Sequence, residues 1–341
     1  CVCASRCSGL PLIYASYPIT PASDILHELA QYKNFGIKTI QAEDEIAAIS
    51  SSIGSAFGGT LAVTGTSGPG LDLKSEAIGY AVMTELPVVV VDIQRGGPST
   101  GLPTKSEQTD LLAAMYGRHG EAPLPVIAAA TPGDCFYIML EAFRLALKYM
   151  TPVIVLSDGG LSNASEPWKI PDENNLPDLK PEFHTKQANF SPYQRNQETL
   201  ARNWAIPGTP GLEHRLGGLE KHSVTGEISY DPENHERMVL LRDEKIKRIK
   251  KDLPPLEIIG PGKNKILVVS WGSVYGPAFS AIKELQEQGH PVSMIQLRYL
   301  NPFQNNLADI LKNFEKVLVP EMNLGALSSM LRSEFLVDTI P

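Results

Sequence analysis

The sequence predicts an α/β protein with two parallel sheets, and three observations support this class. Short apolar strands alternate with amphipathic helices from Leu10 to about Asp158. Each predicted strand runs into a loop that carries Gly, Pro, Ser or Thr. A second, shorter series of strands and helices begins at Lys265. With 341 residues, the chain is long enough to form two hydrophobic cores.

Six strands are expected in the first unit, and all are short and rich in β-branched residues. They cover residues 12–16, 37–41, 60–65, 86–93, 125–130 and 151–158. The helix expected within residues 132–150 carries apolar side chains at helical spacing at Cys135, Met139, Phe143 and Ala146. Since helices separate the strands, we expect a parallel sheet that is covered on both faces.

The alternation stops after Gly159, where the chain becomes polar and rich in proline before a charged helix within residues 232–253. Connections of this length are usually functional or bound to a partner, so we expect it to cross the surface and contact a neighbouring subunit. In the second unit we expect strands over residues 265–272, 291–303 and 316–323, with helices over 276–289, 307–314 and 325–336.

The chain therefore divides into a first α/β domain over residues 1–165, an extended connecting segment over 166–262, and a smaller α/β domain over 263–341. The start lacks an initiating methionine and the end follows closely on a helix. We expect the first domain to be incomplete at its N-terminus and the last to be truncated.

Charge and composition narrow the function classes. The net charge of −8 disfavours nucleic acid or an anionic membrane surface as the main partner. Apolar runs are only as long as strands, so we expect a cytoplasmic protein. Three of the four cysteines lie in "CVCASRC", whose spacing matches no iron–sulfur motif, and we expect no metal on this chain.

Four loops are candidates for a shared binding site, because ligands of parallel sheets lie beyond the carboxyl ends of the strands. These are the loops in "YPITP", "AEDE", "TGTSGPG" and "DIQRGGPSTGLPTK". The third lacks the lysine of a P-loop and the spacing of a dinucleotide fingerprint, but its glycines would let a ring approach the backbone. Thr20 lies between two prolines in the first loop, where it either caps a helix that begins at Pro21 or faces a ligand.

Charged residues in two of these loops suggest chemistry. Glu43 and Asp44 are explained by a helix N-terminus, which favours acidic side chains. Glu45 leads directly into the apolar "IAAI", and burial there would favour a carboxyl group that holds a proton, as catalytic acids do. Arg95 and Lys105 share one glycine-rich loop and either bind an anionic substrate or are merely solvated. No HExxH, GxSxG or CxxC motif is present, so the residues alone indicate an α/β enzyme with one site for an anion.

Several long motifs carry a family resemblance. They are "YPITPASDILHEL", "EDEIAAISSSIGSAFGG", "TGTSGPGLDLKSEAIGYAVMTELPVVVVDIQRGGPSTGLPTK", "WAIPGTPGLEHRLGGLEK" and "VPEMN". With these motifs the sequence resembles the alpha subunits of 2-oxoglutarate:ferredoxin oxidoreductases, in the thiamine-diphosphate-dependent 2-oxoacid:acceptor oxidoreductase family. The resemblance implies a pyrimidine-binding domain followed by a smaller transketolase C-terminal-like domain. It also implies a beta subunit that carries Mg²⁺ and a 4Fe–4S cluster, and that shares the thiamine diphosphate.

The resemblance assigns roles to individual residues. Glu45 matches the glutamate that hydrogen-bonds the aminopyrimidine ring of the cofactor, and Thr20 matches a threonine that faces the substrate carboxylate or the cofactor. Cofactor contacts are also expected from the turn that contains Thr66, Ser67 and Gly68. Arg95 and Lys105 become candidates for binding the carboxylates of 2-oxoglutarate.

The implied reaction is the oxidative decarboxylation of 2-oxoglutarate, in which coenzyme A takes the acyl group and ferredoxin takes the electrons. Three alternatives stay open at the level of the sequence. These are a noncatalytic scaffold subunit of such a complex, an enzyme for pyruvate or branched-chain 2-oxoacids, and a transketolase-like transferase without a redox partner.

Overall fold

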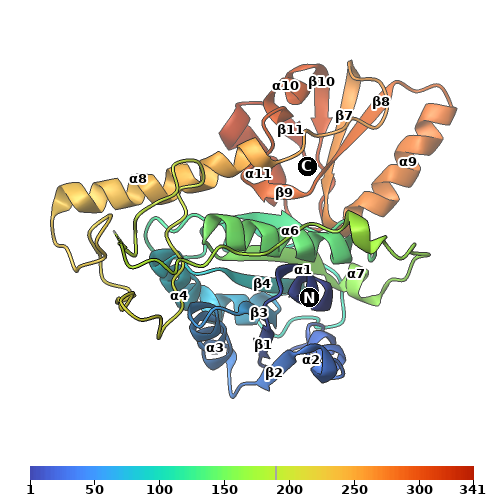
Figure 1. The fold of residues 1–341 in the computed structure, drawn as a ribbon. Coiled ribbons are helices and arrows are strands. Elements are labelled where there is room, and N and C mark those ends of the chain that lie inside the picture. The colour runs from blue at the N-terminus through green and yellow to red at the C-terminus, as the bar shows by residue number, and fades with distance from the viewer. Residues whose placement is uncertain (189) are drawn as a thin grey trace.

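The computed structural model describes residues 1–188 and 190–341, whose strands form two sheets (Figure 1). The strand order of the large sheet is β2-β1-β3-β4-β6-β5-β9. Its members are β1 (Leu12–Ser16), β2 (Ile37–Gln41), β3 (Leu61–Thr66), β4 (Val88–Gln94), β5 (Val126–Ala128), β6 (Val153–Asp158) and β9 (Tyr299–Asn301). The first six strands are parallel and β9 runs antiparallel to β5. The predicted α/β class with parallel sheets is therefore confirmed.

Helices cover both faces of the large sheet. They are α1 (Val2–Ser8), α2 (Ser23–Leu29), α3 (Glu45–Phe57), α4 (Gly68–Thr84), α5 (Leu111–Tyr116), α6 (Asp134–Tyr149) and α7 (Gly159–Asn163), with a 3₁₀ turn at Lys33–Phe35. Because side chains alternate along a strand, Val88 and Val90 of β4 face the core under α3, α4 and α5. Val89 and Val91 face the core under α1, α2 and α6. Burial on both sides explains why this strand is apolar at nearly every position.

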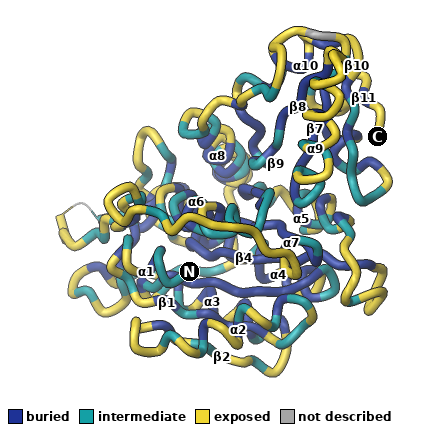
Figure 2. Tube along the Cα trace, turned by 90° about the vertical axis from the view of Figure 1, so that its right-hand side faces the viewer, coloured by how far each residue is buried: buried dark blue, intermediate teal, exposed yellow. Residues whose placement is uncertain are grey.

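The connecting segment contains α8 (Pro232–Ile249) and 3₁₀ turns at Glu173–Asn175 and Lys250–Asp252. Much of it is exposed, as the yellow trace in Figure 2 shows. Two aromatic side chains of this segment, Tyr193 and Trp204, are nevertheless buried. The segment is thus packed onto the first domain and does not simply pass over it.

The second sheet has the order β11-β10-β7-β8, and all its strands are parallel. They are β7 (Asn264–Trp271), β8 (Val292–Leu297), β10 (Phe314–Leu318) and β11 (Thr339–Ile340). The helices of this unit are α9 (Tyr275–Glu287), α10 (Leu307–Lys312) and α11 (Ala326–Phe335), with a 3₁₀ turn at Gly272–Val274.

The single strand expected over residues 291–303 is wrong, because the chain there forms two strands that belong to different sheets. It leaves the small sheet after Leu297 and pairs with β5 of the large sheet from Tyr299. Arg298 fixes the change of direction. Its carbonyl accepts the Ala128 N–H at 2.8 Å, and its guanidinium pairs with Asp134 at the start of α6.

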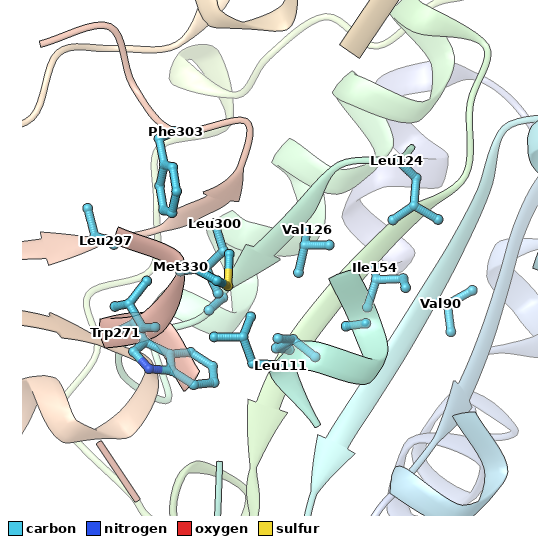
Figure 3. Close-up of a cluster of buried hydrophobic side chains, with 14 of the residues drawn as sticks. Val90, Leu111, Leu124, Val126, Ile154, Trp271, Leu297, Leu300, Phe303 and Met330 are labelled. Carbon is cyan, nitrogen blue, oxygen red and sulfur yellow. The ribbon is translucent and has the colours of Figure 1, made fainter. Parts of the chain in front are cut away.

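The two sheets share one hydrophobic core (Figure 3). Residues of the first domain that enter it include Val90, Leu111, Leu124, Val126 and Ile154. The second unit contributes, among others, Trp271, Leu297, Leu300, Phe303 and Met330. Removing this much apolar surface from water fixes the two units against each other.

A buried ion cluster joins α4 to the connecting segment. Glu85, at the carboxyl end of α4, is 2% exposed. Both of its carboxylate oxygens accept hydrogen bonds from the guanidinium of Arg195, at 2.6 and 2.8 Å, and one also contacts the Lys245 ammonium. Arg202 donates to the Glu85 carbonyl at 3.0 Å. Although burial opposes ionisation, the charges of Lys245 and Arg195 hold the pKa of Glu85 well below its ordinary value.

We expect Glu85→Ala to lower the free energy of unfolding by about 3–5 kcal/mol, since it leaves Arg195 and Lys245 buried without an anion. Denaturant unfolding of the chain measures this change. Asp243→Ala is the matched control, because it breaks the exposed pair with Lys247 on α8 and should cost less than about 1 kcal/mol. Equal effects of the two substitutions would contradict the assignment.

The same cluster predicts a pH dependence of stability. A carboxyl group with a depressed pKa in the folded state stabilises the protein above the pKa of the unfolded chain, near 4.5 for glutamate. The contribution of Glu85 is therefore lost as the pH falls below about 4.5. The free energy of unfolding of the unsubstituted chain should drop more steeply over this range than that of Glu85→Ala.

Candidate active site

The parallel register places four strand ends at one edge of the large sheet. Ser16 of β1 is paired with Gln41 of β2, and Thr66 of β3 with Asp92 of β4. The loops that follow these strands therefore begin side by side, as the sequence predicts.

Glu45 is the first residue of α3 and is only 7% exposed. Its neighbours Glu43 and Asp44 are exposed, and the Asp44 carboxylate caps the helix by accepting the Ala47 N–H at 2.7 Å. Among the described residues, no group donates a hydrogen bond to the carboxylate of Glu45. The three adjacent acidic residues therefore differ in role: one caps the helix, and the buried one is left open to a ligand.

A glycine turn brings the other predicted cofactor residues to Glu45. A Cβ atom placed on Gly70 would lie 2.1 Å from Oγ1 of Thr66 and 2.9 Å from Cγ of Glu45, so both side chains contact this glycine closely. Ser67, which precedes α4, is buried, and its hydroxyl has no partner in the part of the chain that the structure describes. A buried hydroxyl without a partner at a helix N-terminus is suited to a polar ligand.

Gly68, the first residue of α4, lies against another acidic side chain. A Cβ atom there would come within 2.7 Å of the carboxylate of Asp110, just before α5. Asp110 is in turn held by its backbone N–H, which donates to Oε1 of Gln94 at 3.1 Å. The turn over residues 66–70 is thus flanked by carboxyl groups on two sides.

The helix start predicted at Thr20 is wrong. The helix α2 begins at Ser23 after Ala22, and the Ser23 N–H bonds to the Ile19 carbonyl at 3.0 Å in the preceding turn. The side chain of Thr20 is exposed, and within the described residues its hydroxyl makes no hydrogen bond. Its carbonyl accepts a hydrogen bond from Nη1 of Arg95 at 2.6 Å. Capping therefore does not explain Thr20, and the structure joins it to Arg95.

The loop from Arg95 to Asp110 is held at several points. The Gly96 N–H bonds to the Lys105 carbonyl at 2.9 Å. Buried Gln108 donates to the Trp271 carbonyl at 3.0 Å and accepts the Met322 N–H at 3.2 Å. The second unit therefore fixes the base of this loop. The side chain of Lys105 is exposed and makes no hydrogen bond or ion pair to another described residue.

Two buried charged groups and the half-buried Asp110 were missed by the sequence reasoning. Lys74 on α4 is completely buried, and burial lowers its pKa to about 8. Asp92 on β4 is also completely buried, and among the described residues neither of its carboxylate oxygens has a hydrogen-bond partner. Burial raises the pKa of Asp92, as does the neighbouring charge of Asp110, and burial raises the pKa of Asp110 to about 6. Asp92 therefore favours its protonated form. An aspartate within the apolar run "VVVVDI" was the available signal.

Two features are absent from the part of the chain that the structure describes. It contains no group of three or more His, Cys, Asp and Glu side chains arranged to bind a metal ion. None of its helices is both long and apolar enough to cross a membrane.

The fold and the site define a class shared with thiamine-diphosphate enzymes. The structure of transketolase from Campylobacter jejuni aligns with 96% of this chain and with 38% of the transketolase chain. The TM-score is 0.52 and the sequence identity is 12%, which shows a common fold. Residues 7–230 match the thiamine-diphosphate-binding region of pyruvate flavodoxin/ferredoxin oxidoreductases, and residues 264–336 match core domain II of pyruvate:ferredoxin oxidoreductase. The chain belongs to this oxidoreductase family, and the resemblance predicted from its motifs is confirmed.

Individual relatives show which members of the family this chain resembles. The 2-oxoglutarate oxidoreductase subunit KorA of Mycobacterium tuberculosis is 56% identical over 99% of this chain and 52% of its own length. The 2-oxoglutarate synthase subunit KorA of Archaeoglobus fulgidus is 38% identical over 92% of this chain and 83% of its own. The structure of 2-oxoglutarate:ferredoxin oxidoreductase from Magnetococcus marinus, with 2-oxoglutarate, coenzyme A and succinyl-CoA bound, aligns at a TM-score of 0.93 and 36% identity. The alignment covers all of this chain but only 60% of the M. marinus chain. This chain also spans about half the length of the M. tuberculosis subunit.

We expect Gly70→Ala to lower the free energy of unfolding by about 1–3 kcal/mol, because the added methyl group would collide with Thr66 and Glu45. Gly79→Ala on the same helix is the matched control. No atom lies within 4 Å of its added methyl group, so it should stabilise the chain by about 0.5–1 kcal/mol. Denaturant unfolding of both variants measures the difference. Stabilisation by both substitutions would show that Gly70 is not closely packed.

Proposed function

We propose that this chain is the alpha subunit, or part of it, of a 2-oxoacid:ferredoxin oxidoreductase that acts on 2-oxoglutarate. The proposed reaction converts 2-oxoglutarate and coenzyme A to succinyl-CoA and CO₂ and passes the electrons to ferredoxin. The observation that carries the proposal is Glu45, a buried carboxylate with no donor among the described residues, beside a turn packed around Gly70. The names of the relatives in M. tuberculosis and A. fulgidus support the choice of 2-oxoglutarate.

The residues present fit the aminopyrimidine half of thiamine diphosphate. Gly70 has no side chain, so Thr66 and Glu45 approach the turn more closely than a Cβ atom would permit. The hydroxyl of Ser67, which has no partner among the described residues, and the backbone N–H of Gly68, the first residue of α4, supply donors at the same place. When bound, thiamine diphosphate supplies the electron sink for decarboxylation. Glu45 would hold a proton on its carboxylate and share it with a ring nitrogen.

Substrate binding is assigned to the neighbouring pair of loops. Nη1 of Arg95 donates a hydrogen bond to the Thr20 carbonyl, while the Nε–H of Arg95 has no partner within residues 1–188 and 190–341. A guanidinium held in this way is oriented to bind a carboxylate. Thr20 would add its exposed hydroxyl, and Lys105 a second cation from the same loop. The M. marinus enzyme binds 2-oxoglutarate, a dicarboxylate, and this likeness supports the assignment.

The division of the cofactor between subunits is also a proposal. We assign the pyrimidine-binding role to residues 1–165 and the transketolase C-terminal-like role to residues 263–341. A beta subunit would carry Mg²⁺ and the 4Fe–4S cluster and bind the diphosphate. The exposed faces of the connecting segment, residues 166–262, are then available to a neighbouring subunit.

The first test is anaerobic viologen reduction by this chain co-expressed with the proposed beta subunit, with thiamine diphosphate, Mg²⁺ and coenzyme A. We expect reduction with 2-oxoglutarate and a loss of about 10²–10⁴-fold in Glu45→Gln, which keeps the shape of the side chain but cannot exchange the proton. Asp44→Asn is the matched control, since the exposed cap of the same helix is not expected to touch the cofactor.

Each alternative gives a different result in this assay. Reduction with pyruvate or a branched-chain 2-oxoacid alone would keep the reaction class and change the substrate. A well-formed complex without any reduction would favour a scaffold subunit. Transfer between sugar phosphates without reduction of viologen would indicate a transketolase-like enzyme.

A second prediction concerns specificity. We expect Arg95→Ala to raise KM for 2-oxoglutarate about 10–100-fold, because it removes a charged hydrogen-bond donor. The effect on pyruvate, which lacks the second carboxylate, should be smaller. Lys105→Ala in the same assay tests the exposed cation. An unchanged KM in Arg95→Ala would remove Arg95 from the substrate site.

A further inference from the structure

Lys74 is the buried charge that the proposed reaction leaves unexplained. Its side chain is completely buried inside the first domain, and its ammonium group has no hydrogen-bond partner among the described residues. A buried ammonium is costly unless anions surround it. The question is therefore which negative charges compensate Lys74.

Helix geometry directs Lys74 toward the candidate site. Gly70 and Lys74 are four residues apart on α4 and so lie on the same face of the helix. Side chains of a helix tilt toward its N-terminus, so the Lys74 stem runs back under Gly70. Oγ1 of Thr66 and Cγ and Oε1 of Glu45 fill the space where a side chain of Gly70 would lie, so the Lys74 stem runs toward these groups.

The anions around Lys74 come from two elements. Glu45 and Asp44 at the start of α3 attract its charge, and so does Asp92 on β4. Asp44 is exposed and hydrated, which leaves Glu45 and Asp92 as the buried partners. Asp92 faces Asp110 as well.

Further charged side chains lie around the pair formed by Asp92 and Asp110. Asp72 on α4 faces both aspartates but is exposed, and Glu107 and Arg95 face Asp110. Since burial and the neighbouring charge of Asp110 both favour the protonated form of Asp92, the pair carries one negative charge. The positive charges of the two buried cations, Lys74 and Arg95, then balance the negative charge of this pair and that of Glu45. The buried cluster is neutral when Glu45 is ionised.

We propose that Lys74 is a positioning residue that keeps Glu45 ionised until the cofactor binds. This rests on the proposed function, because it gives Glu45 its role toward the aminopyrimidine ring. A free aminopyrimidine is unprotonated near neutral pH, so an ionised Glu45 and the ring nitrogen must take up one proton from solution to share it. Without Lys74 the buried carboxyl group would already hold that proton.

The test counts protons during binding of thiamine diphosphate. Isothermal titration calorimetry of the complex with the proposed beta subunit, with Mg²⁺ and in buffers of different ionisation enthalpy, gives the number of protons taken up. We expect Lys74→Met to take up about one proton fewer than the unsubstituted complex at pH 7, where Lys74 is still charged. Correspondingly, from pH 6.5 to pH 7.5 the Kd should rise about tenfold more in the unsubstituted complex than in the variant.

Three further variants make the result specific. Lys74→Gln is uncharged but polar, should behave as Lys74→Met, and carries the test if the Met variant does not assemble. Lys74→Arg retains the charge and should restore proton uptake. Lys221→Met removes another buried lysine, one that donates to the Met83 carbonyl, and should leave proton uptake unchanged.

The outcomes separate this inference from the proposed function. No binding of thiamine diphosphate by the unsubstituted complex would overturn both. Binding without proton uptake, or equal uptake by the Lys74 variants, would overturn the inference alone. Reduced stability of the Lys74 variants with unchanged proton uptake would show that Lys74 only balances Asp92.

Discussion

The ion cluster around Glu85 holds the carboxyl end of α4, and the candidate site depends on that attachment because the same helix begins in the site. Arg195 and Lys245 reach Glu85 from the connecting segment and neutralise it in the interior. At the other end of the helix, Gly68 and Gly70 form the closely packed turn beside Asp110 and Glu45. A rigid helix of 17 residues transmits any shift at one end to the other. The long connection therefore contributes to the site without lying in it.

The second unit supports the site in a similar way. Gln108 makes hydrogen bonds to Trp271 and Met322, so the loop that starts at Arg95 ends on the second unit. The strand β9 pairs with β5 and continues the large sheet beyond the first domain. Together with the shared core in Figure 3, these contacts mean that both units determine the position of Arg95.

Local patterns predicted most strands and helices, because burial on both sheet faces leaves a clear apolar signal in the sequence. The break at Arg298 could not be predicted, since it depends on pairing with β5 and on the distant carboxylate of Asp134. Thr20 followed by proline has the local signature of a helix that begins at Pro21, but the preceding turn moves that start two residues on, to Ser23. In the site, the burial of Glu45 followed from its apolar neighbours. The burial of Lys74 did not, because its compensating charges lie on other elements.

The two buried charge clusters differ in how well their carboxylates are satisfied, although Arg195 and Arg202 of the first cluster each have one buried nitrogen without a partner in the described chain. In the first, both oxygens of Glu85 accept hydrogen bonds and Lys245 donates to one of them. In the second, the ammonium of Lys74 has no partner, and the oxygens of Asp92 receive no N–H within the described chain. Evolution retains unsatisfied buried groups mainly where they act on a ligand or hold internal water. By this reasoning the Glu85 cluster is structural. The Lys74 cluster contains the unsatisfied polar groups expected of a functional site, and Glu45 is one of the charges that attract Lys74.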